Sequence, residues 1–114
     1  MKYAVLIYSP DDPEPWNAMP AEEREAISGE YYALAQEPVT LGGEQLQPGD
    51  TATVVRVKDG ETLTTDGPFA ETKDVLGGFY LIDVENLDAA LEFAARIPAA
   101  RMWGAVEVRP IVEM

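Results

Sequence analysis

Apolar residues along this chain recur at two different spacings, and each spacing predicts one kind of element. Segments that are continuously apolar, or that alternate with polar residues, predict strands, and segments with an apolar residue every three to four positions predict helices. Strands are predicted over residues 2–8, 39–46, 52–58, 61–65, 77–84 and 105–112. Helices are predicted over residues 20–36, with Ile27, Tyr31 and Leu34 inward, and from the Asn86 cap to Pro98, with Leu87, Leu91, Ala94 and Ile97 inward.

Glycine and proline mark the breaks between these elements. Asp59 and Gly60 favour the tight turn of a β-hairpin between the strands at 52–58 and 61–65. The proline-rich stretch at 10–15 predicts a loop, because proline cannot donate a backbone hydrogen bond. Two adjacent glycines at 42–43, inside a predicted strand, indicate a bulge.

The order of these elements predicts the fold. Strand, helix, strand, hairpin, strand, helix and strand form an α+β fold, a ferredoxin-like split βαβ sandwich with an extra central β-hairpin. Its two helices are expected to cover one face of an antiparallel sheet. The strands at 2–8 and 78–84 are apolar on both sides, so the other face is not expected to stay bare. We therefore expect a homodimer in which a second subunit stacks sheet on sheet.

Composition places the chain among ordinary globular proteins, with a single domain at 1–114. Hydrophobic residues make up 46% and charged residues 25% of the 114 residues. The formal net charge of −13 makes nucleic acid and anionic membrane surfaces poor partners. The apolar run near the start is short and acidic residues follow it, so neither a membrane span nor a signal peptide is expected. The expected location is the cytoplasm.

Two residue types that carry much enzyme chemistry are absent. The chain has no cysteine and no histidine, which excludes disulfides, thiolate metal sites and imidazole as a base or metal ligand. Oxygen ligands remain, but no EF-hand spacing is present. We therefore expect any activity or binding to need neither a transition metal nor a cofactor.

The densest group of chemically useful residues is the segment Asp66-Gly67-Pro68-Phe69-Ala70-Glu71-Thr72-Lys73. The functional interpretation is a rigid loop that holds the Asp66 carboxylate in a pocket as a base or an orienting acid. Phe69 and Lys73 would then contact the ligand. The alternative is a surface turn in which Asp66 bonds the local backbone and Phe69 fills the core.

Charged residues on otherwise apolar strands form a second candidate group, Arg56, Glu107 and Arg109. One interpretation is a network of ion pairs on a partly solvated sheet face. The other is a site for an anionic ligand, in which Arg56 or Arg109 grips a carboxylate through two parallel hydrogen bonds. Trp16 and Trp103 lie beside loops, where each would line a pocket or the rim of a dimer.

Several stretches of the sequence resemble the DGPF-domain branch of the YCII-related superfamily. They are DGPFAETKD, LGGFYLIDVENLDAALEFAARIP and VEVRPI, together with the opening MKYAVLIY and the segment LGGEQLQP. The resemblance implies a bacterial protein with a ferredoxin-like fold that pairs sheet to sheet as a dimeric α+β barrel. It also implies kinship with cofactor-independent isomerases and dehalogenases.

The resemblance also bears on the site and the partners. Smaller YCII-type relatives carry a histidine–aspartate pair as a proposed active site, and their histidine would fall near residues 27–32. This chain has no histidine, so that pair cannot operate, and Glu37 is the acid left near the position of the aspartate. DGPF proteins are often encoded beside extracytoplasmic-function sigma factors, which implies a regulatory role.

Two functional hypotheses follow. In the first, a homodimer binds or converts a small anionic molecule without a cofactor, as an isomerase, lyase or dehalogenase would. In the second, the protein is a non-catalytic accessory module whose acidity suits a basic partner protein such as a sigma factor. A deep pocket with convergent polar groups favours the first, and a flat apolar surface outside the dimer interface favours the second.

Overall fold

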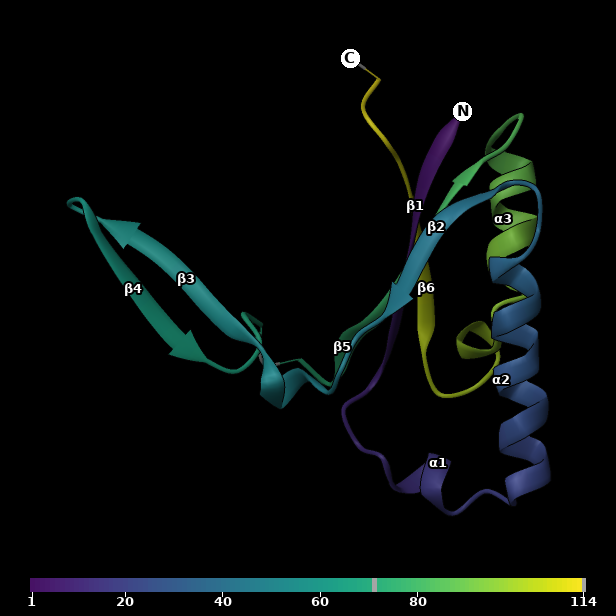
Figure 1. Ribbon diagram of the computed structural model, residues 1–114, viewed down its shortest axis with the longest axis horizontal. Helices are drawn as coiled ribbons and strands as arrows, with labels where there is room; N and C mark the ends of the chain where they lie inside the picture. Colours follow the sequence, from purple (N-terminus) through teal and green to yellow (C-terminus); the bar gives the residue numbers. More distant parts are fainter. Residues whose placement is uncertain (71, 114) are drawn as a thin grey trace.

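The largest element of the structure is a four-stranded antiparallel sheet with helices on one face. The computed structural model describes residues 1–70 and 72–113. The strand order is β2 (Thr40–Gln45), β5 (Asp74–Asp83), β1 (Lys2–Pro10) and β6 (Ala105–Pro110). Helices α2 (Ala21–Ala35) and α3 (Leu87–Ala95) both lie on one side of this sheet (Figure 1). This architecture confirms the predicted ferredoxin-like α+β fold of the single chain.

The hydrophobic core lies between this sheet and its two helices. Tyr3, Val5 and Ile7 alternate along β1 and are buried on the helix side, as the strand pattern predicts. Tyr80 on β5 meets Phe93 on α3 edge to face, with ring centroids 5.6 Å apart and an interplanar angle of 82°. The Tyr80 hydroxyl donates a hydrogen bond of 2.8 Å to the Tyr31 carbonyl on α2. These contacts join both helices to the same strand.

The buried stripe of α3 differs from the predicted one. The residues buried around α3 are Ala90, Phe93, Ala94 and Ile97. The prediction was therefore right for Ala94 and Ile97 and wrong for Leu87 and Leu91, which are 48% and 47% exposed. Turning the helix to bury the Phe93 ring against Tyr80 moves both leucines outward. The Asn86 cap is confirmed, because its Oδ1 accepts a hydrogen bond of 2.9 Å from the Ala89 backbone N–H.

The proline-rich stretch contains a short helix where a loop was predicted. Helix α1 spans Glu14–Asn17 and is preceded by Pro13, with Pro15 inside its first turn. Proline is tolerated there because the first backbone N–H groups of a helix have no intrahelical partner. A 3₁₀ turn at Gly49–Thr51 and another at Pro98–Ala100 complete the helical elements of the described residues.

Several predicted boundaries move by a few residues. α2 begins at Ala21 with Pro20 as its cap, β5 begins at Asp74, and β6 ends at Pro110. The predicted bulge in β2 is confirmed, because its register against β5 shifts between Thr40 and Gly42.

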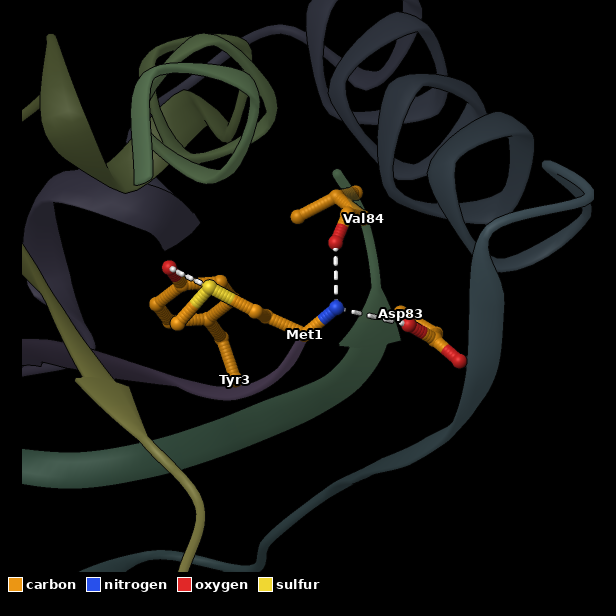
Figure 2. A network of polar contacts seen from close by, with 4 residues as sticks. All are labelled: Met1, Tyr3, Asp83 and Val84. Carbon is orange, nitrogen blue, oxygen red and sulfur yellow. Dashed lines mark hydrogen bonds and ion pairs between the residues drawn. The ribbon is translucent and has the colours of Figure 1, made fainter. Parts of the chain in front are cut away.

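The first strand is tied to the end of β5 by a small polar network (Figure 2). The Met1 amino nitrogen donates to the Val84 carbonyl at 2.6 Å and lies 3.2 Å from Asp83 Oδ1. The Tyr3 hydroxyl reaches the Met1 sulfur at 3.6 Å. These contacts fix the register in which Lys2 faces Asp83.

The sheet face that carries no helix is called the open face here. One row across it runs Glu44, Phe79, Leu6 and Glu107, and the next runs Gly42, Leu81, Ala4 and Arg109. Leu6, Phe79 and Leu81 are only half-buried in the single chain. The open face therefore carries an apolar centre with charged residues toward its edges, as the two-sided apolar strands predict.

A separate two-stranded hairpin, the arm, consists of β3 (Thr53–Lys58) and β4 (Glu61–Asp66). The predicted turn is confirmed: Asp59 and Gly60 have φ of 52° and 79°, the left-handed pair of a tight hairpin turn. The arm projects from the body on the side away from α2 and α3 (Figure 1). The radius of gyration, 16.0 Å, exceeds the roughly 13 Å of a compact chain of this length.

Candidate functional site

The residues expected to form a site around Asp66 are not brought together within the chain. Asp66 lies opposite Thr53 at the base of the arm, whereas Arg56 lies opposite Leu63. Because side chains alternate along a strand, Asp66 and Arg56 point to opposite faces of the arm. Every residue of β4 is exposed, Asp66 included. The role of Asp66 as a base stays a prediction.

The loop after Asp66 folds back over the arm. The Arg56 guanidinium lies 5.1 Å from the centre of the Phe69 ring, a cation–π contact. Phe69 is 74% exposed, so it does not fill the core. Lys73 is also exposed, and the Thr72 hydroxyl donates to the Asp74 carbonyl. Glu71, the other acid of this motif, lies outside the described residues.

Arg109 lies in the other sheet, on the open face. It forms an ion pair of 2.8 Å with Glu107, and this hydrogen bond raises the pKa of the Arg109 guanidinium. Glu37 is paired as well, with Arg96 at 2.8 Å, which joins the end of α2 to the end of α3. Within the single chain, Glu107, Arg109 and Glu37 are therefore all engaged in ion pairs.

A surface cleft lies between α1 and α2. It encloses about 390 Å³ and is lined by Trp16 from α1 and by Ala21, Arg24, Glu25 and Ser28 from α2. These α2 positions follow the three- and four-residue spacing that places side chains on one helix face. The cleft is shallow and largely open to solvent, so a ligand here would bury only one side of its surface.

Arg24 is distinguished by what surrounds it. Its Nε is buried and has no hydrogen-bond partner in the part of the chain that the structure describes. Arg96, Arg101 and Arg109 each form an ion pair of 2.8 Å or less, and Arg56 stacks on Phe69. Among the described residues, Arg24 makes no ion pair and no cation–π contact.

The second cleft has a different chemistry. It encloses about 320 Å³ beside α3 and β6 and is lined by small apolar residues together with Leu91 and Val106. It contains no charged side chain among its lining residues. We therefore place the candidate site in the cleft of Trp16 and Arg24.

Sequence reasoning named Trp16 as a residue beside a loop but did not single out Arg24. The available signal was a cation that interrupts the acidic run Glu22, Glu23 and Glu25. That run is more often a solvated helix face, so the pattern alone does not distinguish Arg24 from its neighbours. Nothing in the sequence alone shows that Trp16 of α1 lines the same cleft as this turn of α2.

The fold and the sequence together place the chain in a known family. The architecture is that of a ferredoxin-like α+β protein, and the YCII-related domain family matches residues 1–114. An uncharacterized protein of Rhizobium meliloti (strain 1021) is 41% identical over 116 residues, which cover 97% of this chain and 92% of that protein. The chain belongs to the YCII-related family. No helix in the described part of the chain is long and apolar enough to cross a membrane.

Proposed function

We propose that this protein is a homodimer that binds a small organic carboxylate in the cleft between α1 and α2. The observation that carries the proposal is Arg24, which lines a cleft of about 390 Å³ and makes no ion pair among the described residues. Its Nε is buried by the protein itself, so the terminal guanidinium nitrogens are the donors that a ligand would meet. A carboxylate that accepts from both of them pairs the charge.

The other lining residues narrow the class of ligand. The Trp16 indole offers an apolar surface for the carbon skeleton of the ligand. Glu25 accepts hydrogen bonds and Ser28 donates or accepts them. A small hydroxy acid or amino acid presents both a carboxylate and a donor, and so matches this set. Asp66 lies on the arm and not among these residues, so the proposed function is binding.

A panel of small hydroxy and amino acids, each paired with its primary amide, tests the ligand class. A ligand at about 100 times its dissociation constant adds about 2.7 kcal/mol of apparent stability. We expect an acid to raise the melting temperature and its uncharged amide not to. With Trp103→Phe, Trp16 becomes the sole indole, and its fluorescence should respond to the same acid.

Arg24→Gln tests the clamp directly. The variant should lose binding of the acid by at least about tenfold, because a hydrogen bond to a charged group contributes about 1.5–3 kcal/mol. Arg101→Gln is the matched control, since Arg101 already pairs with Glu30 at 2.6 Å. Retained affinity in Arg24→Gln, or no response to any acid of the panel, would contradict the proposed function.

The homodimer is supported by the open face. Leu6, Phe79 and Leu81 form an apolar centre that no helix covers in the described chain. Leu6→Glu would place a charge between Phe79 and Glu107 and should dissociate the dimer, because a buried unpaired charge is costly. Leu87→Glu makes the same change on the outer side of α3 and should leave the dimer intact. Light scattering that shows a monomeric parent at micromolar concentration would overturn the homodimer.

A protein-binding accessory role is the second candidate. The exposed arm favours it, because an apolar surface outside the open face fits a protein partner. Resemblance of residues 66–69 to the DGPF branch points to an extracytoplasmic-function sigma factor as that partner. Binding of a purified sigma factor of this class, abolished by charge substitutions on the arm, would support this role.

A further inference from the structure

One face of the arm is uncharged along most of its length. Thr53, Val55 and Val57 alternate along β3, and on β4 Thr64 and Thr62 lie opposite the two valines. Asp66, opposite Thr53 at the base of the arm, is the one charged residue of this face. Val55 is 59% and Val57 is 69% exposed. β-branched residues pack well on pleated surfaces, and a two-stranded hairpin alone is at best marginally stable in water. This face therefore has the composition of a surface that is covered.

The arm and the open face border the same space. The arm leaves the body where β2 ends and β5 begins, and it extends on the side opposite α2 and α3 (Figure 1). Its strands have six residues each, which makes them about 20 Å long. Stacked sheets lie about 10 Å apart. A second copy whose sheet stacks on the open face would therefore lie beside the arm. The arm is long enough to extend past the sheet of that copy.

The open face alone is small for a stable interface. Four strands at about 4.8 Å spacing and about 20 Å in length give a flat area of about 380 Å². A standard interface buries about 800 Å² on each partner. One face of the arm adds about 200 Å² on its own copy and covers as much on the other. With both arms engaged, the contact approaches the standard size.

Charge favours the arm as the element that crosses to a second copy. Two copies with a net charge of −13 repel each other. The arm holds the cations Arg56 and Lys58 against the acids Asp59, Glu61 and Asp66, so it carries only one of these excess negative charges. The Phe69 ring lies against Arg56 on the other face of the arm.

We infer that the arm packs its uncharged face against the flank of a second copy of this chain, so that the dimer is clasped by two arms. The inference rests on the homodimer of the proposed function and adds the arm to its interface. It does not depend on the ligand cleft, because Trp16 and Arg24 lie in α1 and α2.

Cross-linking between isotopically distinct copies tests the arrangement. The chain has no cysteine, so Val57→Cys accepts a benzophenone label at one position. In a mixture of unlabelled and ¹⁵N-labelled copies, we expect cross-linked peptides that pair light with heavy chain. The matched control is Tyr32→Cys on α2, where the side chain is 68% exposed and where few mixed pairs are expected.

Matched charge variants give the second measurement. Val57→Asp and Lys58→Ala each make the net charge one unit more negative, but Val57 lies on the uncharged face and Lys58 on the other. Val57→Asp should weaken the dimer by at least about tenfold, as expected when a charge enters a packed surface. Lys58→Ala should leave the dissociation constant within about threefold of the parent, since exposed charges contribute little.

The outcomes separate the two proposals. A monomeric parent overturns both the homodimer and the arm contact. A dimer that dissociates with Leu6→Glu, but gives only same-isotope cross-links and tolerates Val57→Asp, overturns the arm contact and leaves the homodimer standing. In that case the arm is free for a different protein. Mixed-isotope cross-links together with the loss in Val57→Asp support the clasped dimer.

Discussion

The body and the arm of this protein contain strands with similar apolar patterns, but these residues are buried in the body and exposed on the arm. On β5, Tyr80 and Ile82 are 7% and 0% exposed, because the helices lie over them. On β3, Val55 and Val57 follow the same alternation and are 59% and 69% exposed. An alternating apolar pattern therefore predicts a strand but not its cover. What covers it is decided by the rest of the fold, or by another molecule.

The largest expected difference in stability is between alanine variants of two phenylalanines, one in the body and one beside the arm. Phe93 in the body is 1% exposed and Phe69 beside the arm is 74% exposed, and each has an arginine over its ring. Phe93→Ala should cost about 3–5 kcal/mol, through lost burial and the cavity left behind. Phe69→Ala should cost no more than about 1 kcal/mol, the range of an exposed cation–π contact.

Urea unfolding of both variants measures this contrast. Equal losses in the two would show that Phe69 is covered as fully as Phe93. A loss in Phe69→Ala that shrinks as the protein is diluted and the copies separate would place Phe69 in an interface between copies.

The next difference in stability is between alanine variants of two glycines, one in the body and one at the base of the arm. A Cβ on Gly104 would collide with the Tyr8 carbonyl, so Gly104→Ala should cost more than about 2 kcal/mol. Gly67, at the base of the arm, has φ of +100° but open space around it. Gly67→Ala should cost about 1–2 kcal/mol, from backbone strain alone. Thermal unfolding checks both, and a larger loss at Gly67 would show that another chain packs there.

Alkaline unfolding is expected to begin in the body, because the arm contains no tyrosine. Burial raises the pKa of Tyr80 to about 12, whereas a tyrosine in the unfolded chain ionises near pH 10. The stability from neutral Tyr80 is therefore full below pH 10 and is lost as the pH rises toward about 12.

Tyr80→Phe isolates this effect. It removes the hydrogen bond to the Tyr31 carbonyl, which should cost about 1 kcal/mol at neutral pH. It should also make the loss of stability between pH 10 and 12 shallower than in the parent. Burial also raises the pKa of Tyr31, so a part of the slope remains. An identical slope in the two proteins would contradict the assignment to Tyr80.

The smallest expected effect is that of Asp66→Asn. Because the side chain is exposed at the base of the arm, the variant should change stability by less than about 0.5 kcal/mol. Binding of an acid that the Arg24 cleft recognises should also be unchanged. A loss of that binding with stability intact would restore Asp66 as a ligand-binding carboxylate and would weaken the case for the cleft.

Much of the fold could be predicted from the sequence because the deciding physics is local. Periodicity separates strands from helices, and the Asp59-Gly60 pair supplies the two positive φ angles that a tight hairpin turn needs. Asn86 caps α3 through its own neighbour Ala89. The short helix α1 was missed because prolines usually break helices, and here they occupy the positions where a helix tolerates them.

The candidate site could not be predicted in the same way, since its features depend on residues far apart in the chain. The sequence by itself determined the elements, their order and the absence of imidazole and thiol chemistry. Only the tertiary structure decided that α3 buries Phe93 in place of Leu91, and that Trp16 of α1 lines the same cleft as Arg24, whose Nε has no partner among the described residues. It likewise put Asp66 and Arg56 on opposite faces of an arm. Burial and pairing are properties of contacts between distant segments, and the local pattern of one segment does not contain them.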